Sequence, residues 1–450
     1  MRAGQIIGVL VLTLFVFGVV MVASAGLRPL ARAGAMIEVD PDTGRHQYVD
    51  RGSSAERAEG TASEPSRASD LGGRQVLDTL LGREGRMAMM AMLALAIGAL
   101  VPVERLAALT GLASPAIWLM VFILVLQSLT LVMGVEVHGA VRWLQLGGIQ
   151  FQPSEVAKWG LPAIVAWHCV RHADEMRRFL TGLLPPLVLV AVVCALIAKE
   201  DLGTAVLVML VCTTMLLVAG ARFVHVGALA PIGGLAFVGF VMMEEYRQRR
   251  ITAFLSPFDE VNAGDASYQL IQSMGAIAGG GFGGRGLGNS LQKFDYLPFD
   301  HTDFIFAIIC EELGFFGAAL VIGALVGILW AGMAIVTGRS SPAASDESLA
   351  REAVPAFSRL YGFGILLTFG LQAVINVAVV TGLAPTKGIA LPLVSQGGTG
   401  WILSAFCLGL VISMDRRAWV VSRRAGLVVD ELEEAVDPAT EAGVPAFGKG

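Results

Sequence analysis

Residues 303–336 read DFIFAIICEELGFFGAALVIGALVGILWAGMAIV. The charged residues of this stretch are Asp303, Glu311 and Glu312, and no charge follows Glu312 up to Val336. A helix needs about 20 mostly apolar residues to cross the hydrocarbon core of a bilayer. The stretch therefore predicts a transmembrane helix that is long enough to tilt or to project from the membrane.

The rest of the chain has the same apolar character. Of its 450 residues 55% are hydrophobic and 15% are charged, whereas a soluble domain carries about 25% charge. We therefore expect an all-α integral membrane protein with about ten transmembrane helices. The predicted spans are 4–25, 86–103, 114–134, 155–171, 182–198, 203–221, 225–243, 303–336, 358–383 and 397–414.

Composition also excludes several other classes of protein. The net charge of −5 offers no basic footprint for nucleic acid. The five cysteines all lie in apolar stretches, without the spacing of a zinc site or a disulfide framework, so we interpret them as small buried hydrophobes.

The N-terminus and the basic residues set the expected orientation. The apolar run from Ile6 to Ala23 resembles a signal peptide, but it is longer than the usual core of about 7–15 residues, so we expect an uncleaved helix. With the N-terminus inside, the short inner segments hold twelve Lys or Arg residues and the short outer loops hold three. Basic residues mark cytoplasmic loops, so both termini are predicted to be cytoplasmic.

This orientation divides the chain into four regions. A first transmembrane helix over 1–26 precedes a polar outer insertion over 27–85, part of which is predicted to be disordered. A polytopic membrane domain covers 86–420 and contains a large outer loop over 244–302, between the seventh and eighth spans. An acidic cytoplasmic tail follows over 421–450.

Ionisable residues at membrane depth are costly, so each is a candidate for function. The first cluster of such residues is GAVRWLQLGGIQFQPSEVAK, residues 139–158. Here Trp143 is a substrate contact or an interfacial anchor. Glu155 and Lys158, three residues apart on one helix face, are a structural pair or an anion-facing lysine held by its glutamate. Arg142 is a candidate substrate ligand.

The second cluster is Lys199-Glu200-Asp201, between two predicted spans. It is either a solvated turn or a tight turn that buries Asp201.

The third cluster combines a glycine-rich run over 279–290 with charged residues on either side of it. The run is either a flexible loop or a backbone that approaches a ligand and cradles phosphate with its N–H groups. Arg285 and Lys293 are candidate substrate-binding cations. Asp303 is expected at the boundary between water and membrane, with Glu311 and Glu312 about two helical turns deeper.

The fourth cluster joins a polar helix face to a loop. Gln372 and Asn376 are four residues apart and predict interhelical hydrogen bonds. Lys387 is a candidate anion ligand, and Ser395 a candidate substrate contact. The four clusters together predict an outward-facing cavity for an anionic amphiphile. In it, a carboxylate acts as general base on a sugar hydroxyl and the cations stabilise a departing phosphate.

Several ordered motifs resemble the SEDS family, named for shape, elongation, division and sporulation. They are GAVRW with FQPSEVAK, DLGTA, the run from YQLIQS through GLGNSLQK to HTDFIFAIICEELG, and QAVINV with PTKG and LPLVS. The resemblance covers roughly 1–26 and 86–420. Within the family, GLGNSLQKFDYLP with HTDFIFAIICEELG is more similar to the division members than to the elongation members.

The resemblance implies a peptidoglycan glycosyltransferase that polymerises lipid II and releases undecaprenyl diphosphate in the bacterial cytoplasmic membrane, at the division septum. It implies a class B penicillin-binding protein and other divisome membrane proteins as partners. Asp303 matches the family's acidic residue, with the role of activating the acceptor hydroxyl. Matching positions around the same cavity are Arg142, Trp143, Glu155, Lys158, Lys387 and Ser395. No cofactor is predicted with certainty, and a divalent cation is left open.

Rival functions are a lipid II flippase, an elongation polymerase and a non-catalytic scaffold for the transpeptidase. The chain also departs from the family pattern. Its insertion over 27–85 is longer than the usual first outer loop, and Lys199-Glu200 replaces the usual Gln-Pro. Val141 and Gln396 replace other common residues. None of these changes touches Asp303.

Overall fold

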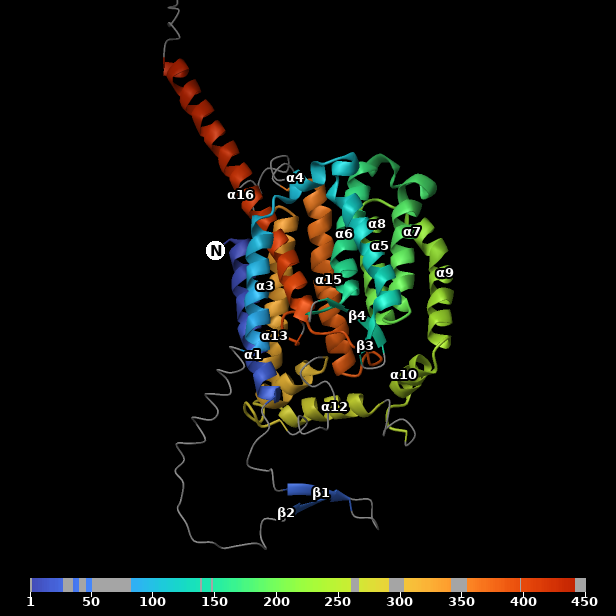
Figure 1. Cartoon of the computed structure of the whole chain (residues 1–450). Coiled ribbons are helices and arrows are strands. Elements are labelled where there is room, and N and C mark those ends of the chain that lie inside the picture. The colour runs from blue at the N-terminus through green and yellow to red at the C-terminus, as the bar shows by residue number, and fades with distance from the viewer. Residues whose placement is uncertain are drawn as a thin grey trace, which may run out of the picture.

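The computed structural model describes residues 2–26, 35–39, 46–50, 82–137, 140–146, 149–259, 267–290, 303–340, 354–396 and 398–441. Within them, long helices stand side by side in one bundle (Figure 1). They are α1 (Ala3–Gly26), α3 (Arg83–Leu100), α5 (Pro115–Met133), α6 (Pro153–Arg171), α7 (Leu184–Ala198), α8 (Leu202–Val218), α9 (Phe223–Met242), α13 (Ile305–Val336), α15 (Ala356–Val380) and α16 (Gly398–Glu441).

Each predicted span falls on one of these helices, which confirms the all-α membrane fold. Among the described residues, seven helices are long and apolar enough to cross a membrane, and α8 is a shorter apolar helix. Helices α3 and α6 carry charged residues near their first turns, among them Glu84 and Glu155, and are not in that set. The number of crossings therefore stays a prediction.

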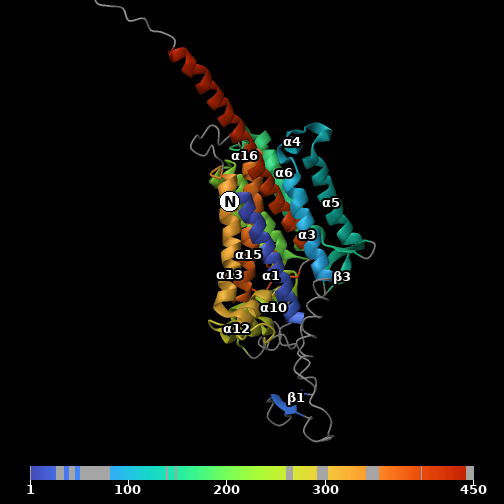
Figure 2. The ribbon, with the colours of Figure 1, turned by 90° about the vertical axis from the view of Figure 1, so that its left-hand side faces the viewer.

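Small residues let two distant helices pack closely. A Cβ added to Gly98 of α3 would lie 2.3 Å from the carbonyl oxygen of Phe406, and one added to Gly409 of α16 would lie 2.3 Å from that of Leu95. Backbone contact of this kind is the usual way in which helices associate in lipid. Helix α1 packs beside α13, so the first helix joins the C-terminal half of the bundle (Figure 2).

The two ends of the bundle differ. Helix α1 begins at the same end as α4 (Val103–Ala108), and α16 leaves the bundle there (Figure 1). At the other end, α10 (Glu245–Leu255) and α12 (Tyr268–Gly280) lie across the bundle. Both belong to the predicted outer loop 244–302. The predicted acidic tail is an extension of α16 that stays helical to Glu441.

The structure adds strands that the sequence analysis did not predict. In the first cluster, β3 (Val135–Val137), β4 (Ala140–Leu146) and β5 (Ile149–Phe151) form an antiparallel sheet in which Val135 pairs with Trp143. Within the 27–85 insertion, β1 (Ala35–Val39) and β2 (His46–Asp50) form an antiparallel hairpin. The predicted disorder from Arg51 to Asp70 lies outside the described residues.

Helix α13 is broken where a single long span was predicted. Gly314 has φ 64° and ψ −154°, a left-handed conformation that favours glycine. The glycine-rich run after α12 packs against this break: a Cβ on Gly284 would lie 2.2 Å from the carbonyl oxygen of Glu312. The glycines therefore allow the outer loop to dock backbone-to-backbone on α13.

Candidate active site

Asp303 is held just before α13 by the side chain of Asn376 on α15. The Nδ2 atom of Asn376 donates to the carbonyl oxygen of Asp303 at 2.8 Å and to that of Ile389 at 2.7 Å. Asn376 is 1% exposed, so one buried amide ties the start of α13 to the loop after α15. This contact replaces the interhelical hydrogen bond predicted for Asn376.

The environment of Asp303 favours its protonated form. Burial and the nearby Asp201 raise the pKa of Asp303 from 3.8 to about 6, whereas Arg142 and Arg250 act in the opposite direction. A carboxyl group with a pKa near neutrality is suited to accept and release a proton. Asp303 is therefore the candidate general base of this site.

Asp201 is buried rather than part of a solvated turn. It caps α8: Oδ1 accepts from the backbone N–H of Thr204 at 3.0 Å, and Oδ2 accepts from the Thr204 hydroxyl at 2.9 Å. Only 9% of Asp201 is exposed. Its fixed negative charge lies close enough to act on Asp303 and on Lys387.

Arg142 reaches the site from β4 because the second cluster holds it there. Its Nε donates to the carbonyl oxygen of Glu200 at 2.8 Å, and the backbone N–H of Val141 donates to the Glu200 carboxylate at 3.1 Å. Val141 and Glu200 are two of the departures from the family pattern. In this chain they contact each other and fix the position of the arginine.

Two further cations come from α10, which the sequence analysis missed. Arg250 donates to the carbonyl oxygen of Thr386 at 3.1 Å and lies over the ring of Tyr246. Arg247 donates to the carbonyl oxygens of Phe240, Ala198 and Lys199 at 2.6, 3.2 and 2.5 Å. It thereby ties α10 to the ends of α7 and α9. The sequence feature that could have identified these two arginines is the run YRQRR, because basic residues are scarce in segments predicted to lie outside.

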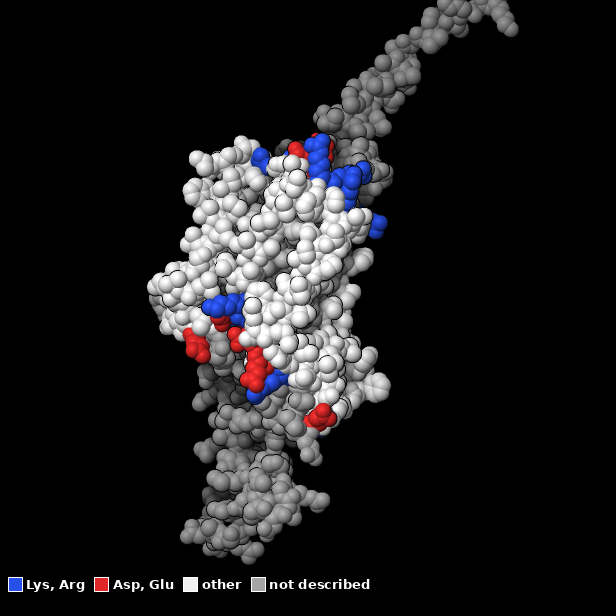
Figure 3. Space-filling view, turned by 90° about the vertical axis from the view of Figure 1, so that its right-hand side faces the viewer, with Lys and Arg blue, Asp and Glu red and all other residues white. Residues whose placement is uncertain are grey.

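Except for Asp303, these charged groups line a cavity of about 70 Å³. Gly388 lies between the cavity and Asp303, since a Cβ added there would be 3.0 Å from Asp303 Oδ2. Burial lowers the pKa of Lys387 in the cavity wall. Seen from the side of α9, charged side chains gather in two places, at the upper end and in the lower half, with a broad uncharged band between them (Figure 3). The charged lining residues are Arg142, Glu200, Asp201, Arg247, Arg250 and Lys387.

Other predicted site residues are engaged within the bundle. Lys158 is 3% exposed; its Nζ lies 2.7 Å from the carboxylate of Glu155 and donates to Oε1 of Gln372 at 2.8 Å. Ser395 is fully buried, and its hydroxyl accepts from the backbone N–H of Leu391 at 2.7 Å. These contacts support the structural interpretation of the Glu155–Lys158 pair and give Ser395 a role in shaping the loop.

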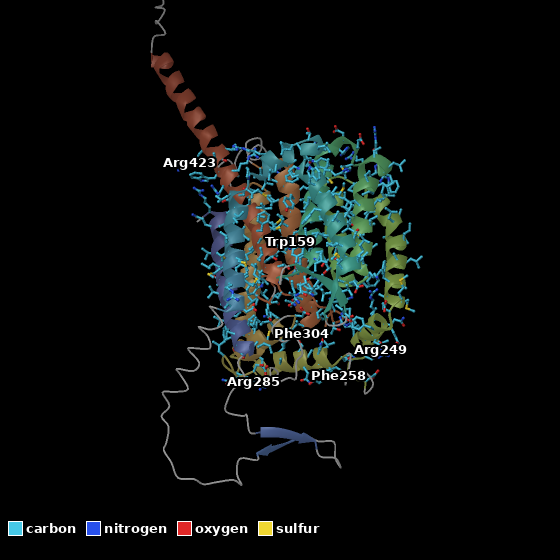
Figure 4. All side chains as sticks on the ribbon, viewed as in Figure 1. Trp159, Arg249, Phe258, Arg285, Phe304 and Arg423 are labelled. Atoms are coloured by element: carbon cyan, nitrogen blue, oxygen red, sulfur yellow. The ribbon has the colours of Figure 1, made fainter. Side chains whose placement is uncertain are left out.

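Trp143 and Arg285 lie apart from the cavity lining. Trp143 is half-buried on β4, next to Arg142. Arg285 lies at the glycine-rich run, where its Nε donates to the carbonyl oxygen of Gly279 at 3.2 Å and is 3.8 Å from Glu311. Figure 4 labels Arg285 at the end of the bundle where α12 lies, below Phe304, the neighbour of Asp303. Lys293 lies outside the described residues.

Several backbone N–H groups of the glycine-rich run already donate to acceptors within the protein. The backbone N–H groups of Arg285 and Gly286 donate to the carbonyl oxygens of Glu311 and Glu312, each at 2.9 Å. The N–H of Gly288 donates to the hydroxyl of Ser24 at 3.0 Å. Since these donors already have protein acceptors, the run anchors the outer loop.

A divalent cation finds a poor set of ligands near Asp303. No group of three His, Cys, Asp or Glu side chains gathers in the part of the chain that the structure describes. Both carboxylate oxygens of Asp201 already accept hydrogen bonds from Thr204. The positive charges of Arg142, Arg250 and Lys387 would repel a divalent metal ion. The positive charge around the cavity comes from Arg142, Arg247, Arg250 and Lys387.

Comparison with known proteins places the chain in a family. The profile of the cell cycle protein family FtsW/RodA/SpoVE matches residues 68–419. This chain belongs to the FtsW/RodA/SpoVE family. Its FtsW-like character is also confirmed: it is 38% identical over 302 residues to the probable peptidoglycan glycosyltransferase FtsW of Idiomarina loihiensis, which covers 67% of this chain and 71% of that protein.

Other members of the FtsW/RodA/SpoVE family support this placement. The probable peptidoglycan glycosyltransferase FtsW of Tolumonas auensis is 40% identical over 288 residues, covering 63% of this chain and 71% of its own length. A solved peptidoglycan synthase complex that coordinates polymerization and crosslinking contains a chain with 27% identity and a TM-score of 0.58, covering 74% of this chain and 89% of that one. The rod shape determining protein RodA of Thermus thermophilus shares the fold, with 22% identity, a TM-score of 0.53 and coverage of 92% and 96%.

Proposed function

We propose that this protein is a peptidoglycan glycosyltransferase that polymerises lipid II during septal wall synthesis. The observation that carries the proposal is the position of Asp303. Its carboxyl group, with a pKa raised to about 6, lies beside Gly388, and Gly388 lines a cavity together with three arginines and a lysine. One proton acceptor with several fixed cations is the arrangement that sugar transfer from a diphosphate requires.

In the proposed reaction, the Asp303 carboxylate accepts the proton of the acceptor's sugar hydroxyl. The hydroxyl oxygen bonds to the anomeric carbon of the donor as the bond between that carbon and the diphosphate oxygen breaks. The electron pair of the broken bond leaves on undecaprenyl diphosphate. Arg250, Lys387 and Arg142 face the same cavity and would stabilise this charge.

Asp201 has a separate role in this proposal. Its two hydrogen bonds to Thr204 keep it in place as a fixed carboxylate, and its charge helps to raise the pKa of Asp303.

We further propose that a class B penicillin-binding protein is the transpeptidase partner and that both termini are cytoplasmic. The similarity to a chain of a peptidoglycan synthase complex supports the first point. The second is supported by α16 leaving the bundle at the end where α1 begins (Figure 1).

The test is a lipid II assay with the purified full-length protein in liposomes, with and without a co-purified transpeptidase. Glycan strands in the presence of lipid II support the proposal. Translocation of labelled lipid II without polymer would identify a flippase. If the folded protein with its partner bound gave neither polymer nor translocation, a non-catalytic scaffold would remain as the function.

A further inference from the structure

Two arginines enclose one tryptophan at the end of the bundle that is remote from the candidate active site. The guanidinium carbon of Arg2 lies 3.6 Å from the centre of the Trp419 ring, and that of Arg423 lies 3.9 Å from it. At these distances each face of an indole has room for one guanidinium, so the two groups stack on opposite faces. Arg2 precedes α1, whereas Trp419 and Arg423 belong to α16.

The charge of this arginine–tryptophan sandwich is not neutralised by the neighbouring acids. Asp415 is 5% exposed and accepts from the Gly4 N–H at 3.3 Å and from the Ser340 hydroxyl at 3.0 Å. Glu104 pairs with Arg417 at 3.6 Å. Among the ion pairs of the described residues, none includes Arg2 or Arg423. Two exposed cations are thus held close together without a carboxylate from the described side chains.

The sandwich lies where a lipid headgroup would lie. Figure 4 places Arg423 where α16 leaves the bundle, and α1 begins beside it (Figure 1). Tryptophan and arginine are typical of the boundary between headgroups and hydrocarbon. From this point an exposed apolar stripe runs along α1 toward the middle of the bundle: Val9, Leu12, Val16 and Val20 are 52, 48, 57 and 38% exposed.

We propose that this sandwich binds the phosphodiester of an anionic phospholipid in the adjacent leaflet, with an acyl chain lying along the α1 stripe. Guanidinium groups bind phosphate oxygens through paired N–H donors, and stacking on an aromatic ring holds them in place. Basic pockets between membrane helices are suited to anionic headgroups. The apolar stripe adds hydrocarbon contact, which a soluble phosphate cannot use.

The test measures lipid retention by the full-length protein. Protein is extracted from nanodiscs of equal phosphatidylglycerol and phosphatidylcholine, and the bound lipids are counted by native mass spectrometry. Wild type is expected to retain phosphatidylglycerol preferentially. Arg2→Gln or Arg423→Gln should each lower this preference at least about five-fold, because each variant removes one guanidinium that donates charge-assisted hydrogen bonds to the phosphate.

Two further variants separate a site from general surface charge. Trp419→Leu keeps every charge but removes the stacking platform, so it should also lower the preference by at least about three-fold. Arg222→Gln removes an exposed arginine from the turn before α9, outside the sandwich, and should change it less than two-fold. Thermal unfolding of each variant checks that the fold is kept.

Three results would overturn the proposal. These are an equal loss in Arg222→Gln, an unchanged preference in Trp419→Leu, and displacement of the lipid by inorganic phosphate at the same phosphate concentration. The first two would assign the preference to net charge, and the third would assign the site to a soluble anion.

Discussion

The backbone of Gly388 lies directly against the carboxylate of Asp303, since a methyl group at this glycine would be 3.0 Å from Oδ2. Gly388→Ala is therefore expected to displace the carboxylate by a few tenths of an ångström. A displacement of this size in a general base should lower the rate of lipid II polymerisation about ten-fold while the unfolding temperature stays nearly unchanged. Initial rates of glycan formation provide the measurement.

The control for this variant is Gly398→Ala. A Cβ at Gly398 would meet nothing within 4 Å, so its rate should stay within two-fold of wild type. Equal rates for both variants would mean that the contact with Gly388 does not position Asp303.

The raised pKa of Asp303 predicts a pH profile. Only the ionised carboxyl can accept a proton, so activity should fall as the pH drops through about 6. At pH 5 roughly a tenth of the carboxyls are ionised, whereas a carboxyl with an ordinary pKa of about 3.9 would be mostly ionised. Initial rates between pH 4.5 and 8 report the midpoint.

A variant gives the profile a second test. Arg250 opposes the upward shift in the pKa of Asp303, so Arg250→Gln should move the midpoint to higher pH as well as weakening substrate binding. If the midpoint lay near pH 4, or if it were the same in Arg250→Gln and wild type, a group other than Asp303 would limit the rate.

Arg247 is expected to act by positioning α10. Its guanidinium donates to three carbonyl oxygens at the ends of α7 and α9, and α10 carries Arg250 to the cavity. Arg247→Ala should lower kcat/KM about ten-fold, and Arg247→Lys should restore part of the loss because a single ammonium can reach only some of these acceptors.

Arg249→Ala is the matched control for Arg247. Arg249 lies on the same helix but is 61% exposed, and it pairs with Glu245 on the surface. Its rate should stay within two-fold of wild type. If both alanine variants lost activity equally, the charge of α10 rather than its anchorage would be the cause.

The glycine-rich run offers a comparison of two adjacent residues. Gly284 has φ 72° and no room for a Cβ, since Glu312 O would be 2.2 Å away; Gly283 has nothing within 4 Å. Gly284→Ala should therefore cost about 2 kcal/mol or more of stability, whereas Gly283→Ala should be nearly neutral. Thermal unfolding in detergent compares the two, and equal unfolding temperatures would contradict the docking of this run on α13.

Apolar runs were enough to predict the bundle. The same runs could not reveal the break at Gly314, because that break depends on the docking of a loop that is distant in sequence. The strands β3 to β5 were hidden by their short length, with three residues in two of them.

The candidate site was predicted in part. Arg142 and Lys387 line one cavity, Asp303 lies next to Gly388 of its wall, and of the two interpretations left open for Asp201 the structure supports burial. Arg250 was missed because α10 lies in a long outer segment, to which the charge rule gives little weight. For Lys158, the sequence predicted only the local contact. The spacing of three residues placed it beside Glu155, but only the fold shows that its ammonium group also donates to Gln372.

The central claim is that Asp303 is the general base of lipid II polymerisation, and Asp303→Asn tests it most directly. The variant keeps the size of the side chain, and the backbone carbonyl that accepts from Asn376 remains. With its transpeptidase partner bound and its unfolding temperature unchanged, the variant is expected to lose at least about a hundred-fold in the rate of glycan formation. Polymerisation at the wild-type rate would contradict the assignment.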